Sequence, residues 1–212
     1  MAKIIAFSGG CFSGKTTTME VLREELFNRG YHVIIFDELI RDATKKPIDE
    51  LRKDPAKYFK VQKQIINDKM EQEGLAFMLA AHKQFTEKTI VLIDRAISDS
   101  LFYLENYINT TLLPDELIKE YCDLHKGIVE YAKWAFKSYT IVAEFVPLGR
   151  RDNTDTYRPK SIDVLKHYEH DAIHIINKSF LSEGKSLYKE YDLNTRPAVE
   201  VAEDIIKALE LE

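Results

Sequence analysis

The sequence has 212 residues and a formal net charge of −5, with 45% hydrophobic and 31% charged residues. This length and composition are typical of a globular protein with a sizeable core, so we expect a single domain over residues 1–212. The acidic balance argues against a nucleic-acid coat protein or a membrane-surface protein, although it leaves room for a local basic groove. Since no apolar run approaches the about 18 residues of a membrane span, we expect no membrane partner.

The cysteines and the start of the chain indicate a compartment. Cys11 and Cys122 lie far apart, lack metal-ligand spacing and do not make a disulfide framework. The apolar run near the N-terminus is too short for a signal peptide and fits a strand better. We therefore expect a reducing, cytoplasmic location.

Strand-like and helix-like segments alternate along the chain, which predicts an α/β fold with a parallel sheet between helices. The segment at residues 89–93 is the most strongly apolar of the predicted strands, so it should lie at the centre of that sheet. Strands are expected at residues 3–7, 32–36, 89–93, 139–146 and 187–192. Helices are expected at residues 15–28, 55–84, 98–107, 115–136, 162–181 and 197–209.

A phosphate-binding loop is predicted directly after the first strand, where Gly9, Gly14, Lys15 and Thr16 match the pattern G-x-x-x-x-G-K-[ST]. A buried strand before the loop and a helix after it are the context that this mechanism requires, because backbone N–H groups then point at the phosphates. Lys15 is expected to reach the β- and γ-phosphates of ATP, and Thr16 to coordinate Mg²⁺. The residues assigned to nucleotide binding are Gly9, Gly10, Cys11, Phe12, Ser13, Gly14, Lys15, Thr16 and Thr17.

A second polar point follows the central strand. Asp94 ends that strand, at the edge where open α/β sheets bind ligands, and can hold magnesium directly or through water. Arg95 comes next and can grip an acceptor's phosphate or its developing charge. The alternative is a helix-capping aspartate beside a surface arginine.

Two segments carry a family resemblance. Residues 94–103, DRAISDSLFY, resemble the "DR…S…Y" segment of thymidylate kinases and the "ERS" segment of deoxynucleoside kinases. The loop SGGCFSGKTTT is more similar to the "GGxxxGKTT" loop of the ribosylnicotinamide-kinase-like P-loop domain, which many phages encode. Phe12 departs from both groups, since thymidylate kinases usually have Gly there. The resemblance implies a three-layer P-loop kinase fold of about five parallel strands, with a charged lid, acting in the cytoplasm of a cell or of a phage host.

The acceptor side is assigned through the same resemblance. Asp37, Glu38 and Arg41 follow the second strand, and Glu38 with Arg41 keeps the family's "E-x-x-R" spacing. The resemblance implies that Glu38 orients or deprotonates the acceptor hydroxyl, with Asp37 as its competitor, and that Arg41 binds the acceptor. The alternative is a surface ion pair three residues apart. Asp99 either contacts an acceptor sugar or caps its helix.

A charged loop at residues 147–160 fits a lid over the transferred phosphate. Its arginines can neutralise charge in the transition state. Asp155 and Arg158 resemble the family's "DG-x-R" segment, so Arg158 is the first candidate, followed by Arg151 and Arg150. The alternative is a solvated charged loop.

These features predict an ATP- and Mg²⁺-dependent kinase whose acceptor is a nucleoside or a (deoxy)nucleoside monophosphate. A kinase acting on a polynucleotide end or on a modified base in DNA is an alternative that the acidic charge disfavours. A regulatory P-loop ATPase or nucleotide switch is another, and it would not need Glu38, Arg41 or Arg158. A homodimer remains open.

Overall fold

The computed structural model describes residues 2–39, 48–82, 88–149, 162–181 and 186–210. Its sheet consists of β1 (Lys3–Ser8), β2 (His32–Phe36), β3 (Thr89–Asp94), β4 (Ile141–Phe145) and β5 (Leu187–Tyr191). The spatial order is β2-β3-β1-β4-β5, and every neighbouring pair is parallel. The predicted α/β class and the five-stranded parallel sheet are therefore confirmed.

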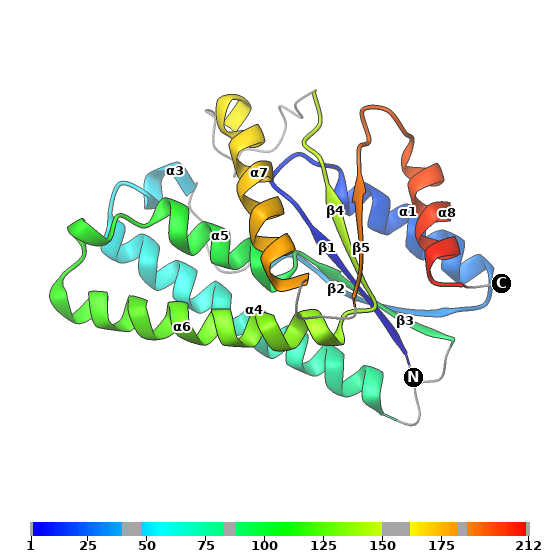
Figure 1. Cartoon of the computed structure of the whole chain (residues 1–212), viewed down its shortest axis with the longest axis horizontal. Helices are drawn as coiled ribbons and strands as arrows, with labels where there is room; N and C mark the ends of the chain where they lie inside the picture. Colours follow the sequence, from blue (N-terminus) through cyan, green and yellow to red (C-terminus); the bar gives the residue numbers. More distant parts are fainter. Residues whose placement is uncertain (1, 40–47, 83–87, 150–161, 182–185, 211–212) are drawn as a thin grey trace.

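The helices lie on both faces of this sheet (Figure 1). They are α1 (Lys15–Asn28), α3 (Ile48–Leu51), α4 (Pro55–Ala81), α5 (Ile97–Tyr107), α6 (Asp115–Ser138), α7 (Ile162–Leu181) and α8 (Ala198–Ala208), with a short 3₁₀ turn at Thr110–Leu112. The predicted strands and helices are all present, and their ends shift by a few residues. The short α3 and the 3₁₀ turn were not expected. None of the described helices is long and apolar enough to cross a membrane.

Alternation along the strands divides the core between two layers. In β1, Ile5 and Phe7 face the layer of α1 and α8, whereas Ile4 and Ala6 face the layer of α4, α5, α6 and α7. All of these β1 side chains are buried on both faces, as expected of a central parallel strand. Figure 1 shows α1 and α8 together on one side of the sheet and the other long helices opposite them.

The strand order places the site. The chain moves outward from β1 in both directions, to β3 and β2 on one side and to β4 and β5 on the other. In open α/β sheets, ligands bind at such a reversal, outside the carboxyl ends of the strands. The segments after β1, β2 and β3, which contain the predicted loop, Glu38 and Arg95, all lie at this edge.

Candidate active site at the carboxyl edge of the sheet

The phosphate-binding loop between β1 and α1 turns through backbone with positive φ. The φ angles are 132° at Gly9, 56° at Phe12 and 82° at Gly14. Glycine adopts such conformations easily, whereas a residue with a Cβ is strained there. Gly14 is the N-cap of α1. The unpaired N–H groups of the first helical turn are therefore available for an anion next to the loop.

Lys15 folds over the loop. Its Nζ donates to the carbonyl oxygens of Gly9 at 2.9 Å and Gly10 at 2.8 Å, and to Ser13 Oγ at 3.1 Å. Burial, and then the positive charge of Arg95, lower the pKa of Lys15. The ammonium thus lies within the loop, where a phosphate would relieve its burial by bringing negative charge.

Asp99 is hydrogen-bonded to the end of β1 and to the start of the phosphate loop. It is fully buried, and its carboxylate accepts hydrogen bonds from Ser8 Oγ at 2.5 Å and from the Gly9 N–H at 3.1 Å. Arg95 Nη1 lies 3.7 Å from the same carboxylate. Burial raises the pKa of Asp99 to about 6, although Arg95 and Lys15 oppose the rise. Both carboxylate oxygens accept hydrogen bonds from the loop or the end of β1, and a contact with an acceptor sugar stays a prediction.

Asp94 and Thr16 offer a place for a cation. Asp94 is buried at the end of β3, and its Oδ1 has no hydrogen-bond partner among the described residues. Thr16 is exposed in the first turn of α1. A buried carboxylate oxygen without a donor is unfavourable unless a cation or its bound water satisfies it. Hydroxyl and carboxylate oxygens are ligands that suit Mg²⁺, so these residues fit that ion.

Glu38 and Arg95 meet across the edge of the sheet. Arg95 Nε donates to Glu38 Oε1 at 2.5 Å, and both side chains are almost buried. Arg95 Nη1 also donates to the Gly9 carbonyl and to Tyr103 Oη, each at 3.3 Å. Burial opposes the charge of Arg95, but Glu38 and other neighbours raise its pKa well above its ordinary value. A permanent cation therefore connects the predicted acceptor-side carboxylate to the phosphate loop.

Lys69 was missed by the sequence reasoning. It comes from α4 and lines a pocket with Glu38, Asp94, Arg95 and Tyr103. Its Nζ donates to the Asp94 carbonyl at 2.8 Å. Burial lowers the pKa of Lys69, and Glu73, with Oε1 at 3.8 Å, opposes this shift. The pocket beside the loop thus contains a second buried cation.

Glu169 of α7 was also missed, and it contacts the loop directly. Its Oε2 accepts from the Cys11 N–H at 3.4 Å, and its Oε1 accepts from Tyr107 Oη at 2.6 Å. A Cβ at Gly10 would lie 3.1 Å from Glu169 Oε2. A side chain at Gly10 would therefore require Glu169 to shift by a few tenths of an ångström. In the sequence, Glu169 is one of several polar residues in a predicted helix, and the sequence does not show which of them are buried.

The remaining predicted residues are exposed, buried or outside the described part of the chain. Asp37 and Thr17 are exposed, and the Asp37 carbonyl accepts from Gln72. Cys11 is buried, and its sulfur lies 3.7 Å from both Arg95 Nη2 and Tyr103 Oη. Arg41 and the lid residues Arg150, Arg151, Asp155 and Arg158 lie outside the described residues.

The fold and the loop define a protein with the P-loop kinase-like fold, which solved structures bear out. The NadR protein in complex with NR matches with a TM-score of 0.62 at 13% identity, over 100% of this chain and 52% of that one. The NadR protein in complex with NAD and AMP-PNP matches with a TM-score of 0.56 at 14% identity, over 100% and 50%. Thymidylate kinase from Candida albicans matches with a TM-score of 0.51 at 13% identity, over 99% and 91%. The chain thus spans about half the length of the NadR chains.

The family is defined by sequence. The model of a family described as an AAA domain matches residues 4–170, which is most of the chain, so the protein belongs to that family. No curated protein has a sequence similar enough to match. The predicted resemblance to P-loop kinases is confirmed at the level of the fold.

Proposed function

We propose that this protein transfers the terminal phosphate of ATP, with Mg²⁺, to a nucleoside or a (deoxy)nucleoside monophosphate. The observation that carries the proposal is the pair formed by Glu38 and Arg95, joined at 2.5 Å beside the phosphate loop. A nucleotide switch needs the loop and a metal ligand, but it does not need a buried carboxylate and a guanidinium in a second pocket.

The donor side of the reaction belongs to the loop. Backbone N–H groups of the loop and of the start of α1 bind the phosphates, and the Lys15 ammonium binds the β- and γ-phosphates. Thr16 and Asp94 would hold Mg²⁺, which when bound neutralises charge on the phosphate oxygens. Positioning and charge neutralisation carry most of the rate in such a reaction, so no covalent enzyme intermediate is required.

The acceptor side belongs to the pocket. With a nucleoside acceptor, the carboxylate of Glu38 takes the proton of the acceptor hydroxyl as the new P–O bond forms and the bond to the leaving nucleoside diphosphate breaks. A monophosphate acceptor attacks through an ionised phosphate oxygen and has no hydroxyl proton to give up at that atom. Arg95 and Lys69 stabilise negative charge on the transferred group from that side. Asp37, the neighbouring residue and the competitor for the proton, is exposed, and this favours Glu38 as the base. Arg41, Arg151 and Arg158 remain proposed on sequence grounds as acceptor and lid residues.

The similar structures support this class of reaction without identifying its acceptor. One NadR structure contains NR and another contains NAD with AMP-PNP, and the Candida albicans protein is a thymidylate kinase. The identities of 13–14% relate these proteins by fold. The acceptor must therefore be identified by experiment.

The test is transfer from labelled ATP to a panel of nucleosides, nucleoside monophosphates and oligonucleotides. We expect one nucleoside or monophosphate to give a phosphorylated product well above the water blank. With a nucleoside acceptor, Glu38→Gln should lower transfer by about 10²–10⁴-fold, which is the usual contribution of a general base. ATP binding should persist, because Lys15 and the loop N–H groups that would bind the phosphates are unchanged.

The matched control is Glu130→Gln, which makes the same chemical change on an exposed side chain of α6 that pairs with Lys133. Its activity should equal that of the unmodified protein. Transfer to water alone, unaffected by Glu38→Gln, would favour the switch, and product only with oligonucleotide would favour the polynucleotide alternative. Loss of transfer in Asp37→Asn but not in Glu38→Gln would move the base to Asp37.

A further inference from the structure

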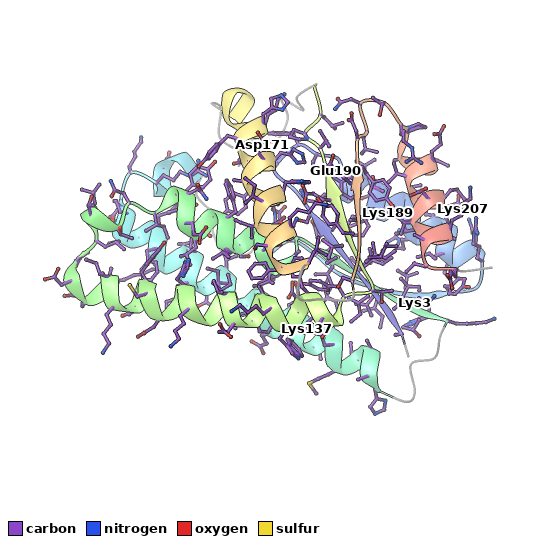
Figure 2. All side chains as sticks on the ribbon, viewed as in Figure 1. Lys3, Lys137, Asp171, Lys189, Glu190 and Lys207 are labelled. Carbon is purple, nitrogen blue, oxygen red and sulfur yellow. The ribbon has the colours of Figure 1, made fainter. Side chains whose placement is uncertain are left out.

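A cluster of histidines and glutamates lies away from the phosphate loop, where α7 packs on β4 and β5. Glu144 and Glu190 are register partners on these strands and point to the same face of the sheet. His174 of α7 lies between them, with Nδ1 3.1 Å from Glu144 Oε1 and 3.1 Å from Glu190 Oε2. Figure 2 labels Glu190 on β5 and Asp171 on α7, the two elements that meet here.

The oxygen and nitrogen atoms of this cluster offer more lone pairs than there are N–H and O–H hydrogens to bond to them. Tyr188 Oη also lies 2.8 Å from His174 Nδ1 and donates to Glu144 Oε2 at 2.8 Å. A single ring nitrogen carries one hydrogen at most, and it cannot bond to three oxygens at once. Two neighbouring carboxylates also repel each other, and Glu144 is completely buried. A cation among these oxygen and nitrogen atoms would satisfy all of them.

His170 supplies a fourth group. It lies one helical turn before His174, so the two rings share a face of α7. Its Nδ1 is buried without a hydrogen-bond partner in the described part of the chain, 3.6 Å from Glu144 Oε1, and its Nε2 lies 4.0 Å from Glu190 Oε2. Bonds of about 2.1 Å in a tetrahedron require ligand atoms about 3.4 Å apart. The separations of 3.1 Å that join His174 Nδ1 to Glu144 Oε1 and to Glu190 Oε2 are close to that value, and among the described residues these three form the group whose ligand atoms all lie within 4.8 Å of one another.

We propose that Glu144, His174 and Glu190 bind one divalent transition-metal ion of the zinc class, with His170 beside them. A donor set that combines an imidazole with carboxylates suits Zn²⁺ or Co²⁺, whereas Mg²⁺ and Ca²⁺ prefer six or more oxygens. Two carboxylates and a neutral imidazole also balance the charge of a divalent ion. The site is separate from the proposed Mg²⁺ ligands Thr16 and Asp94.

The groups around the cluster hold it in this orientation. Asn177 Nδ2 donates to Glu144 Oε2 at 2.5 Å, and together with Tyr188 it leaves Oε1 directed at His174. Such outer contacts orient ligands in metal sites. Lys178 is the nearby competing cation, and its Nζ lies 4.0 Å from the centre of the Tyr188 ring. It is placed over that ring, so the space between the carboxylates is left to the histidines.

The proposed ion would be structural and would fix α7 relative to the active site. Asn177 also donates to Ser8 Oγ at 2.8 Å, and Ser8 donates to Asp99 beneath the phosphate loop. Glu169, one residue before His170, accepts from the Cys11 N–H of the loop. Metal binding would therefore hold α7 against the sheet and, through these contacts, hold the loop.

The experiment measures binding of ZnCl₂ and CoCl₂ by the full chain without a histidine tag, without nucleotide and with excess MgCl₂. We expect one equivalent of Zn²⁺ per chain after dialysis and a tetrahedral Co²⁺ absorption spectrum. Saturation at about 100 times the dissociation constant should raise the Tm by roughly 5–10 °C. The variants His170→Ala and His174→Ala should bind at least about tenfold more weakly.

His167→Ala is the matched control, because it removes an exposed histidine from the same helix. It should bind zinc like the unmodified protein, and so should Asp94→Asn. Glu190→Gln tests the site at a partly exposed ligand and does not depend on tolerance of a histidine deletion. Absence of stoichiometric zinc in the unmodified protein, or equal affinity in all of these variants, would overturn the proposal.

Discussion

Gly9 begins the phosphate loop at a point where the backbone of a neighbouring strand leaves no room for a side chain. Its φ angle is 132°, a conformation that residues with a Cβ rarely adopt. A Cβ built there would lie 2.6 Å from the carbonyl oxygen of Phe145 and 3.3 Å from its nitrogen. Phe145 ends β4. Relief of this contact would require movement of a sheet strand, so we expect Gly9→Ala to be strongly destabilising.

The magnitude follows from two costs. The backbone conformation costs about 1–3 kcal/mol for a residue with a side chain, and forced overpacking costs about 1–3 kcal/mol more. The sum is about 2–6 kcal/mol. Gly30→Ala is the matched comparison, because Gly30 has a φ of 79° but a Cβ there would meet nothing within 4 Å. That variant should lose about 1–2 kcal/mol from the backbone cost alone.

The assay is urea unfolding at fixed pH, followed by far-UV circular dichroism and by the fluorescence of the one tryptophan, Trp134. Since about 1 kcal/mol shifts the Tm of a protein of this size by about 2–4 °C, thermal unfolding gives an independent measure. Gly9→Ala should be less stable than Gly30→Ala by at least about 1 kcal/mol, allowing for partial relaxation of the strand. Equal losses in the two variants would refute the steric argument.

Two further variants test the buried charges and the helices. Burial raises the pKa of Glu73 from 4.5 to about 7. The stability that this group contributes is therefore present below about pH 4.5 and is lost as the pH rises through about 7. The unfolding free energy of Glu73→Gln, measured in urea titrations, should rise by about 3 kcal/mol relative to that of the unmodified protein between pH 4.5 and 8. A constant difference across that range would contradict the prediction. Gly127→Ala, on an exposed position of α6 with nothing within 4 Å of the added Cβ, should raise the unfolding free energy by about 0.5–1 kcal/mol; an unchanged or lower urea midpoint would count against it.

The elements were predictable because their signals are local. The strand at Thr89–Asp94 is a continuous apolar run, and the loop pattern fixes both the end of β1 and the start of α1. The ends of other elements moved by a few residues because tertiary contacts decide them. For example, α4 ends at Ala81, whereas the helix was predicted to reach residue 84.

The candidate site was only half predictable because several of its polar groups come from distant helices. Lys69 and Glu169 lie on α4 and α7, and their spacing is also that of a solvated polar face. Only the packing of those helices on the sheet buries them and brings them to Asp94 and to the loop. Asp99 shows the same limit in another form, since the sequence did not predict its hydrogen bonds to Ser8 and Gly9.

The structure explains why Phe12 differs from the glycine found at this position in thymidylate kinases, which the sequence alone did not explain. The φ of 56° at Phe12 is a conformation that glycine adopts without strain, and this accounts for the glycine at the same position in related loops. Arg95 is likewise left-handed, with a φ of 64°. Each such residue costs about 1–2 kcal/mol, and such strain persists only where surrounding contacts maintain it. Leu148 N–H donates to the Phe12 carbonyl at 2.8 Å, and Arg95 is held by Glu38 and by the Gly9 carbonyl. One strained residue therefore lies in the phosphate loop, and the other connects that loop to Glu38. This is the junction between the proposed donor and acceptor sides, where pre-organised geometry would serve phosphoryl transfer.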